Sequence, residues 1–312
     1  MDELQSISIS RRGLLSILGA TPVFGASGCL GGNTAVNVLS AGSLAQTFEA
    51  HIGPAFQAET GVAIHGEYFG TNAIMRLVED RTKHPDIIVS ADATLLRDRL
   101  YGTVTDWDVE FATNSLGIGY NEDTEFGQRL ANGEAWFDVV RDMDDGELTI
   151  SDPNLDPLGY RAVQAFQLAE MAHDLEGFRE DVLGIAYEEP DEPQIVSGIE
   201  SGARAAGIVY RNMAVDHGIP FREFPDAYNF ANPELADHYS TVAFVTDEEA
   251  YRAVGRPIVY NATVHGATER PEASAQLIQF LIDHPDLLVE AGLTVADDLP
   301  SATGDLPDGI VL

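Results

Sequence analysis

The 312-residue sequence is poor in cysteine and in positive charge. It holds one cysteine, Cys29, and one lysine, Lys83, and its 17 Lys+Arg face 51 Asp+Glu for a formal net charge of −34. A single cysteine excludes a disulfide framework. A surface this acidic repels nucleic acid and anionic lipid, which argues against both as partners. The charge exceeds what solubility needs and indicates an extreme halophile, because molar salt shortens the Debye length to about 3 Å and screens self-repulsion.

Signatures of enzymes are also missing. The sequence has no G-x-S-x-G, Walker, H-E-x-x-H or G-x-G-x-x-G motif, and its eight histidines are scattered singly. Aromatic residues make up 8%, with tryptophan only at Trp107 and Trp136, whereas sugar clefts usually stack rings on tryptophan. The sequence therefore indicates neither an enzyme nor a cofactor.

The N-terminus lacks a hydrophobic run long enough to cross a membrane, which takes about 20 residues. "SRRGLLSILGATPVFGASGC" instead has a twin arginine, Arg11-Arg12, a short apolar stretch, and small residues ending at Cys29. This pattern predicts a twin-arginine export signal over residues 1–28. "ASGC" resembles a lipobox, with Ala26 where leucine is usual, so Cys29 would carry lipid and begin a tether over residues 29–34. The alternative is a free thiol in a flexible tail.

From Ala35 onward, strand and helix patterns alternate. "AVNVLSAGSL", "VAIHGEYFG" and "PDIIVSAD" predict strands, with helices between them, the second of which opens at Thr71. "SLGIGYN" reads as a strand that leaves this lobe. We predict a two-lobed α/β fold of the periplasmic-binding-protein type, each lobe a mainly parallel sheet flanked by helices with a ligand cleft between them. Lobe I would comprise residues 35–114 plus 240–312, and lobe II residues 115–239.

Three predicted helix starts follow small or polar residues: Gly42-Ser43, Gly70-Thr71, and the stretch from Asp156 to Gly159. A helix start offers unpaired amides and the positive end of the helix dipole, which favours an anion. Ser43 and Thr71 add hydroxyl donors. Serine and threonine also cap helices without any function, but strand ends and helix starts converge on the cleft in such sheets. The pattern therefore predicts an oxyanion site.

Seven segments carry a resemblance to a known family: "SAGSL", "GTNAIMRLVED", "PDIIVSAD", "FATNSLGIGYN", "SDPNLDPLGYRA", "GIVYRNMAVDHG" and "GRPIVYNATV". In this order they resemble the archaeal tungstate/molybdate-binding proteins of ABC importers, over essentially the whole mature chain. The resemblance implies a first anion loop, a second anion loop, an Asp-Pro stretch with its backbone, a second carboxylate and a tyrosine donor. Gly42 and Ser43 would form the first anion loop and Thr71 the second. Asp156 would belong to the Asp-Pro stretch, together with the backbone of Pro157 and Leu158. Glu192 would be the second carboxylate and Tyr210 the tyrosine donor. Glu189 is the fallback for the second carboxylate, and Asp152 is expected to be the structural helix cap.

The resemblance further implies a monomeric receptor, lipid-anchored at the outer face of the cell membrane, that delivers oxyanion to a permease and its ATPase subunit. A carboxylate beside a dianion should repel it by about 4 kcal/mol per pair of unit charges at 4 Å in an effective dielectric near 20. Mo(VI) and W(VI) can expand from four to six oxygen ligands, so Asp156 and Glu192 would bind the metal centre of the oxyanion. Sulfate cannot expand in this way, and the same acids would exclude it.

Other functions stay open at this stage. One is a sulfate- or phosphate-type receptor, in which phosphate could donate its remaining proton to Asp156. Another is an exported hydrolase that uses Asp156 and Glu192 as an acid/base pair. A third is an adhesion or scaffold protein, which the lobed organisation disfavours. Tungstate and molybdate have nearly the same size and charge, so the sequence does not rank them.

Overall fold

The computed structural model describes residues 35–247 and 251–312. The predicted export signal, the tether and Cys29 lie outside the described residues. Within them, no helix combines the length and the apolar character needed to cross a membrane.

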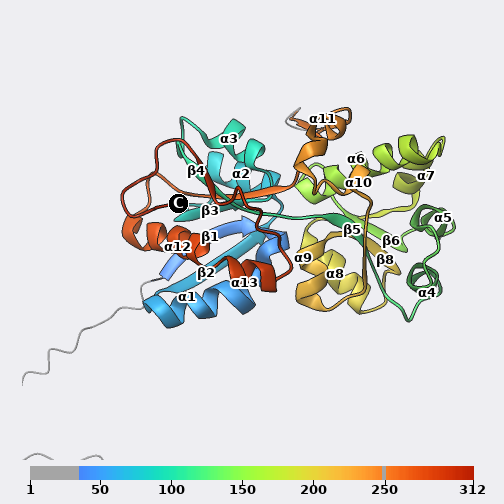
Figure 1. Cartoon of the computed structure of the whole chain (residues 1–312), viewed down its shortest axis with the longest axis horizontal. Helices are drawn as coiled ribbons and strands as arrows, with labels where there is room; N and C mark the ends of the chain where they lie inside the picture. The colour runs from blue at the N-terminus through green and yellow to red at the C-terminus, as the bar shows by residue number, and fades with distance from the viewer. Residues whose placement is uncertain (1–34, 248–250) are drawn as a thin grey trace, which may run out of the picture. The chain divides into compact units, whose positions relative to one another are not determined.

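The first sheet contains six strands in the order β13-β4-β12-β3-β1-β2 (Figure 1). Their bounds are β1 (Ala35–Ala41), β2 (Ala63–Phe69), β3 (Ile87–Ser90), β4 (Asp108–Thr113), β12 (Val259–Val264) and β13 (Ser301–Thr303). Strand β1 pairs in parallel with β2 and β3, whereas β12 pairs antiparallel with β3 and β4. We call this sheet and its helices the first lobe.

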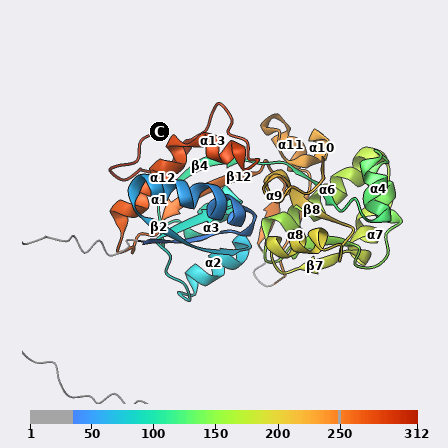
Figure 2. The same cartoon turned by 90° about the horizontal axis from the view of Figure 1, so that it is seen from below.

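Helices cover both faces of the first sheet because side chains alternate along its strands. Leu39 of β1 packs in one cluster with Ile74 and Leu95, while Val38 belongs to another with Phe56. Figure 2 shows the helices on both faces of this sheet from below. The elements of this lobe are η1 (Gly42–Leu44), η2 (Thr47–Ile52), α1 (Gly53–Thr60), α2 (Thr71–Glu79), α3 (Ala93–Leu100), α12 (Pro271–Asp283) and α13 (Pro285–Glu290).

The second sheet contains five strands in the order β7-β6-β8-β5-β9, and with its helices it forms the second lobe. Its strands are β5 (Leu116–Tyr120), β6 (Leu148–Ser151), β7 (Tyr187–Glu189), β8 (Ala206–Tyr210) and β9 (Phe221–Glu223). Its helices are α4 (Glu125–Ala131), α5 (Trp136–Arg141), α6 (Pro157–His173), α7 (Phe178–Ile185), α8 (Glu192–Glu200) and α9 (Arg211–His217). Gly207 of β8 lets α8 lie directly on the sheet, since a Cβ there would be 2.7 Å from Ile195 Cγ2.

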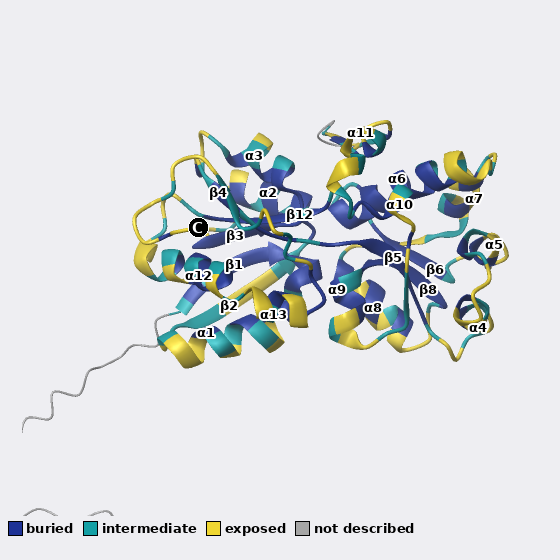
Figure 3. Cartoon of the chain, in the orientation of Figure 1, coloured by how far each residue is buried: buried dark blue, intermediate teal, exposed yellow. Residues whose placement is uncertain are grey.

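The chain passes between the lobes twice. It leaves the first sheet through β4, crosses at Asn114 and Ser115, and enters the second sheet as β5. The return path runs through α10 (Asp226–Asn229), η3 (Pro233–Leu235), α11 (Ala236–Tyr239), β10 (Ala243–Val245) and β11 (Arg252–Val254) before β12. The strands of both sheets are mostly buried (Figure 3).

The predicted two-lobed α/β fold is confirmed, but the prediction of mainly parallel sheets is wrong in detail. In the first sheet, β12 and β13 make antiparallel pairs, and in the second, β5 is antiparallel to both β8 and β9. The reason is the double crossing. A strand that carries the chain out of a lobe, or back into it, does not follow a helix crossover and can run against its neighbours. Each sheet is therefore mixed.

Candidate functional site

The first predicted anion loop begins where β1 ends. Gly42 and Ser43 open η1 and are buried. A Cβ at Gly42 would lie 2.3 Å from Glu192 Oε2, at the start of α8 in the second lobe. Glycine is thus what allows the Glu192 carboxylate to lie against the loop.

The second predicted anion loop meets the segment just before α6. Gly70 caps α2, and a Cβ there would lie 2.4 Å from the Leu155 carbonyl oxygen and 2.9 Å from Asp156 Cβ. The hydroxyl of Thr71 accepts a hydrogen bond from the Ala91 amide at 3.1 Å. Because that bond uses a lone pair, the Thr71 proton remains available to a ligand.

Asp156 is the N-cap of α6. Its Oδ1 accepts from the Leu158 amide at 3.2 Å and its Oδ2 accepts from the Ser151 hydroxyl at 2.5 Å. The expectation that Asp152 would be the cap is therefore wrong. Asp152 closes a turn by accepting from the Asn154 amide, and the helix begins only at Pro157. Pro157 has no N–H and the Leu158 amide is occupied by Asp156, so neither backbone offers a free donor here.

Glu192 is the first residue of α8, and its neighbour Asp191 takes the capping role by accepting from the Gln194 amide. The Glu192 side chain is fully buried, and neither carboxylate oxygen has a hydrogen-bond partner among the described residues. Glu189, the fallback, ends β7 and pairs with Arg204 at 3.5 Å. Of the two glutamates, Glu192 is the one that lies against Gly42.

Burial dominates the electrostatics of the two acids. It raises the pKa of Asp156 to about 6, against the lowering effects of Ser151, the Leu158 amide, Arg161 and Glu192. Burial raises the pKa of Glu192 well above its ordinary range, and the charge of Asp156 raises it further. The amide and hydroxyl of Ser43 oppose that rise but do not reach hydrogen-bonding geometry with the carboxylate. Neighbouring buried carboxyls do not both ionise easily, so each of these two acids favours its protonated form more than an exposed acid does.

Tyr210 is the last residue of β8, in the second lobe. Its hydroxyl accepts from Arg161 Nη1 at 2.7 Å, and its pKa is raised by burial and in part by the charge of Asp156. Its ring meets that of Tyr260 edge-on, with centroids 6.3 Å apart. The structure thus gathers Ser43, Thr71, Asp156, Glu192 and Tyr210 around one buried position between the lobes.

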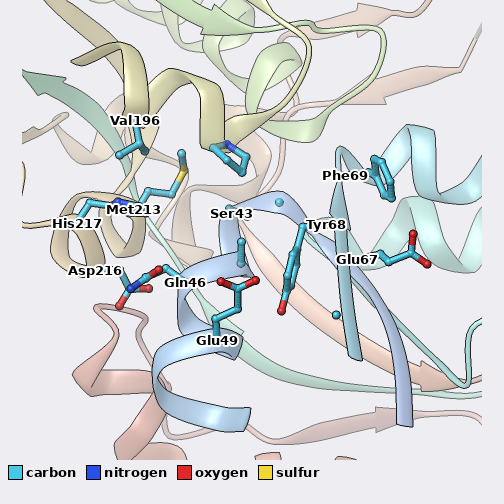
Figure 4. A pocket seen from close by; sticks show the side chains of 14 residues that line it. Ser43, Gln46, Glu49, Glu67, Tyr68, Phe69, Val196, Met213, Asp216 and His217 are labelled. Carbon is cyan, nitrogen blue, oxygen red and sulfur yellow. The ribbon is translucent and has the colours of Figure 1, made fainter. Parts of the chain in front are cut away.

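A pocket of about 490 Å³ opens beside this position (Figure 4). Gly42 and Ser43 form part of its wall, together with β2 of the first lobe and α8 and α9 of the second. Three acids line it: Glu49, Glu67 and Asp216.

Across residues 35–247 and 251–312, no three histidine, cysteine, aspartate or glutamate side chains gather as a metal ion would require, so Asp156 and Glu192 form a pair of carboxylates without a third.

Comparisons with known proteins give the family. Residues 36–292 match the family described as bacterial extracellular solute-binding protein. The chain belongs to this family. It is 45% identical to an uncharacterized solute-binding protein of Halobacterium salinarum, over 97% of both chains, and 27% identical to a molybdate/tungstate-binding protein of Pyrococcus abyssi, over 95% of this chain and 96% of the other. Its fold is similar to that of the periplasmic molybdate-binding protein of Azotobacter vinelandii, with a TM-score of 0.59 and 16% identity over 84% of this chain and all of that one.

The sequence reasoning missed a set of polar residues that hold the hydroxyl donors of this solute-binding protein. Tyr260 OH lies 3.0 Å from Ser43 Oγ and accepts from Asn114 Nδ2 at 3.2 Å. Asn212 Nδ2 donates to the Ser43 carbonyl at 2.7 Å. Tyr260 stands in "PIVYNATV" and Arg161 in "LGYRA", so both lay inside motifs already singled out. No local pattern assigns contacts to residues 49 and 70 positions away for Arg161, or 146 and 217 positions away for Tyr260.

Proposed function

We propose that this solute-binding protein captures tungstate or molybdate between its lobes and delivers it to an ABC permease driven by an ATPase subunit. The observation that carries the proposal is the pair of fully buried carboxyl groups, Asp156 and Glu192, set among hydroxyl donors from both lobes. The name of the Pyrococcus abyssi relative supports the same ligand class.

The chemistry favours an anion whose central atom can accept carboxylate ligands. An ordinary oxyanion would be repelled by Asp156 and Glu192 whenever they are ionised, in a site where burial already raises the pKa of both. Bonds from Asp156 and Glu192 to Mo(VI) or W(VI) replace that repulsion with coordination, and the hydroxyls of Ser43, Thr71 and Tyr210 donate to the oxo groups. Coordination favours the ionised form of both carboxyls, whose pKa values burial raises. The backbone of Pro157 and Leu158 contributes by fixing the Asp156 cap.

Sulfate and phosphate are the competing ligands within the same class. A phosphate site would use Asp156 as an acceptor for the phosphate proton and would leave Glu192 without a role. A hydrolase is disfavoured because both carboxyls are fully buried, which leaves neither open to a bulky substrate. We accordingly propose a binding protein without enzymatic activity or resident cofactor, acting as a monomer.

The test is calorimetric titration of the empty protein at high salt with tungstate, molybdate, sulfate and phosphate. We expect tight binding of tungstate or molybdate and at least 100-fold weaker binding of sulfate and phosphate. Tight binding of sulfate or phosphate instead, or no binding of any of the four, would reject the proposal.

The remaining parts of the proposal concern location and division of the chain. We propose export through the twin-arginine signal of residues 1–28 and anchoring to the outer face of the membrane by lipid on Cys29, followed by the 29–34 tether. Lobe I is proposed as 35–114 plus 240–312, and lobe II as 115–239. A Cys29→Ser variant that stayed in the membrane fraction, rather than entering the medium, would contradict the anchor.

A further inference from the structure

Arg161 is the largest of the fully buried side chains, with 1% of its surface exposed. It lies on the second turn of α6, directly after the Asp156 cap, in a site that otherwise gathers acids and hydroxyls. A guanidinium loses its hydration when it is buried and is retained only where it is well paired. Its contacts therefore indicate what it is for.

The guanidinium has partners in both lobes. Its Nη1 donates to the Tyr210 hydroxyl at 2.7 Å in the second lobe and to the Ala91 carbonyl at 2.9 Å in the first. Its Nη2 lies 3.5 Å from Asp92 Oδ2, which also accepts from the Tyr160 hydroxyl at 2.6 Å. Arg161 is thus fixed from several sides and cannot turn toward another acceptor.

Arginine can only donate, so its bond decides the direction of the Tyr210 hydroxyl. The hydroxyl oxygen accepts from Nη1, and the phenolic proton must point elsewhere. The same logic holds for Thr71, whose oxygen accepts from the amide of Ala91. The Ala91 carbonyl thus accepts from Arg161, and the Ala91 amide donates to Thr71. The Tyr210 hydroxyl in the second lobe and the Thr71 hydroxyl in the first each keep a proton to donate.

We propose that Arg161 is a positioning residue for the anion: by donating to Tyr210 it turns the phenolic proton into the site, and through Ala91 it ties this donor to the Thr71 side of the cleft. The inference rests on the proposed function and adds to it a residue that acts through another.

A double-mutant cycle tests the proposal, because two residues that act through one proton are not additive. We expect Tyr210→Phe and Arg161→Lys each to weaken oxyanion binding on the order of 10- to 100-fold, as for a lost hydrogen bond to a charged group. The lysine keeps the charge, but it is shorter and has one nitrogen, whereas arginine places Nη1 on Tyr210 and Ala91 while Nη2 faces Asp92. The double variant should bind no more weakly than Tyr210→Phe alone.

Arg97→Lys is the matched control. Arg97 is held by Asp108 and Glu110 within the first lobe, away from the site, so its replacement perturbs an ion pair without changing affinity. If Arg161→Lys does not fold at high salt, Arg161→Met, which buries no unpaired charge, takes its place in the cycle. Because it also removes a charge that acts on Asp156, the double variant should then bind no more weakly than Arg161→Met alone.

The outcomes separate this inference from the function on which it rests. Wild-type affinity in Arg161→Lys, or fully additive losses in the double variant, would overturn the role of Arg161 while the receptor function stands. If the wild type takes sulfate or phosphate instead, the cycle is run with that anion, since the argument concerns a donor to any tetrahedral oxyanion. Failure to bind any of the four anions would overturn both.

Discussion

At the scale of single residues, Asp156 and Glu192 combine burial, which favours their neutral forms, with a position suited to charged ligands. Asp156 is held by three donors or cations, whereas Glu192 has no hydrogen-bond partner in the described part of the chain. An unsatisfied buried carboxylate is rare in a folded protein and is usually explained by a group that binds there. The predictions at this scale follow from that asymmetry.

The first prediction is that Asp156→Asn and Glu192→Gln each abolish tight tungstate binding, although each removes negative charge near an anion. Asparagine keeps the size and capping ability of aspartate but is a far poorer metal ligand. A purely electrostatic site predicts the opposite, stronger binding with fewer acids. Calorimetry at high salt decides between them, with Glu189→Gln as the control that leaves affinity unchanged.

The second prediction concerns stability in the absence of ligand. The folded pKa of Asp156 is about 6, against 3.8 for an ordinary aspartate, so the folded state holds more protons than the unfolded state between these values. Stability is then greatest below about pH 4 for this group and falls as pH rises through the window to about 6, and the raised pKa of Glu192 adds a loss that begins near the ordinary pKa of glutamate. For Asp156 the loss is roughly 3 kcal/mol, at 1.36 kcal/mol per unit.

Glu192→Gln should therefore raise the melting temperature of the empty protein at pH 7.5 and flatten its dependence on pH. Thermal melts from pH 4.5 to 8 at constant high salt measure this. A pH dependence of the melting temperature that Glu192→Gln leaves unchanged would contradict the raised pKa of Glu192.

At the scale of elements, the site depends on how closely η1 and α8 approach each other. Gly42 has no side chain, and this lets the first turn of α8 bring Glu192 against the loop after β1. Asp191 caps α8, which leaves Glu192 free of that role. Where η1 and α8 meet, Glu192 of the second lobe lies against Gly42 of the first.

The third prediction is that Gly42→Ala prevents this approach and removes tungstate binding. The added Cβ would stand 2.3 Å from Glu192 Oε2 and 3.3 Å from Pro193 Cδ, so the Glu192 carboxylate would have to leave its place against the loop. Gly184→Ala is the matched control: it lies within α7, has no atom within 4 Å of a new Cβ, and should gain about 0.5–1 kcal/mol of helix stability with unchanged affinity. Wild-type binding by Gly42→Ala would show that the carboxylate need not lie there.

Local sequence patterns predicted where helices and strands lie better than whether neighbouring strands run parallel or antiparallel. The helix start at Thr71 and the strand ending before Asp92 follow from periodicity and turn residues, and the structure has both. The antiparallel course of β5 and β12 does not follow, because pairing is set by contacts far apart in sequence. Asp152 and Asp156 both precede proline, and only the turn between them decides which one caps α6. The place of Arg161 likewise depends on Ala91 and Tyr210, which lie 70 and 49 residues away.

At the scale of the whole molecule, the acids greatly outnumber their partners. Arginines such as Arg97 and Arg129 each bind two acids, yet 17 basic residues cannot neutralise 51 acidic ones. Most carboxylates therefore repel one another across the surface, and this repulsion opposes the compact state. Salt is the only counter-charge available to them in quantity.

The last prediction follows from that excess. Between about 0.1 M and 3 M KCl the Debye length falls from about 10 Å to less than 3 Å, so the repulsion between surface carboxylates is screened and the melting temperature should rise steeply. Because the Debye length is already about 3 Å at 1 M salt, most of the rise in melting temperature should come by about 1 M, with NaCl and KCl alike. Sucrose, which favours compact states by exclusion but screens nothing, is the control and should raise the midpoint far less. A midpoint that is unchanged between the two salt concentrations would contradict the halophilic interpretation, and a rise matched by sucrose would assign the effect to exclusion rather than charge.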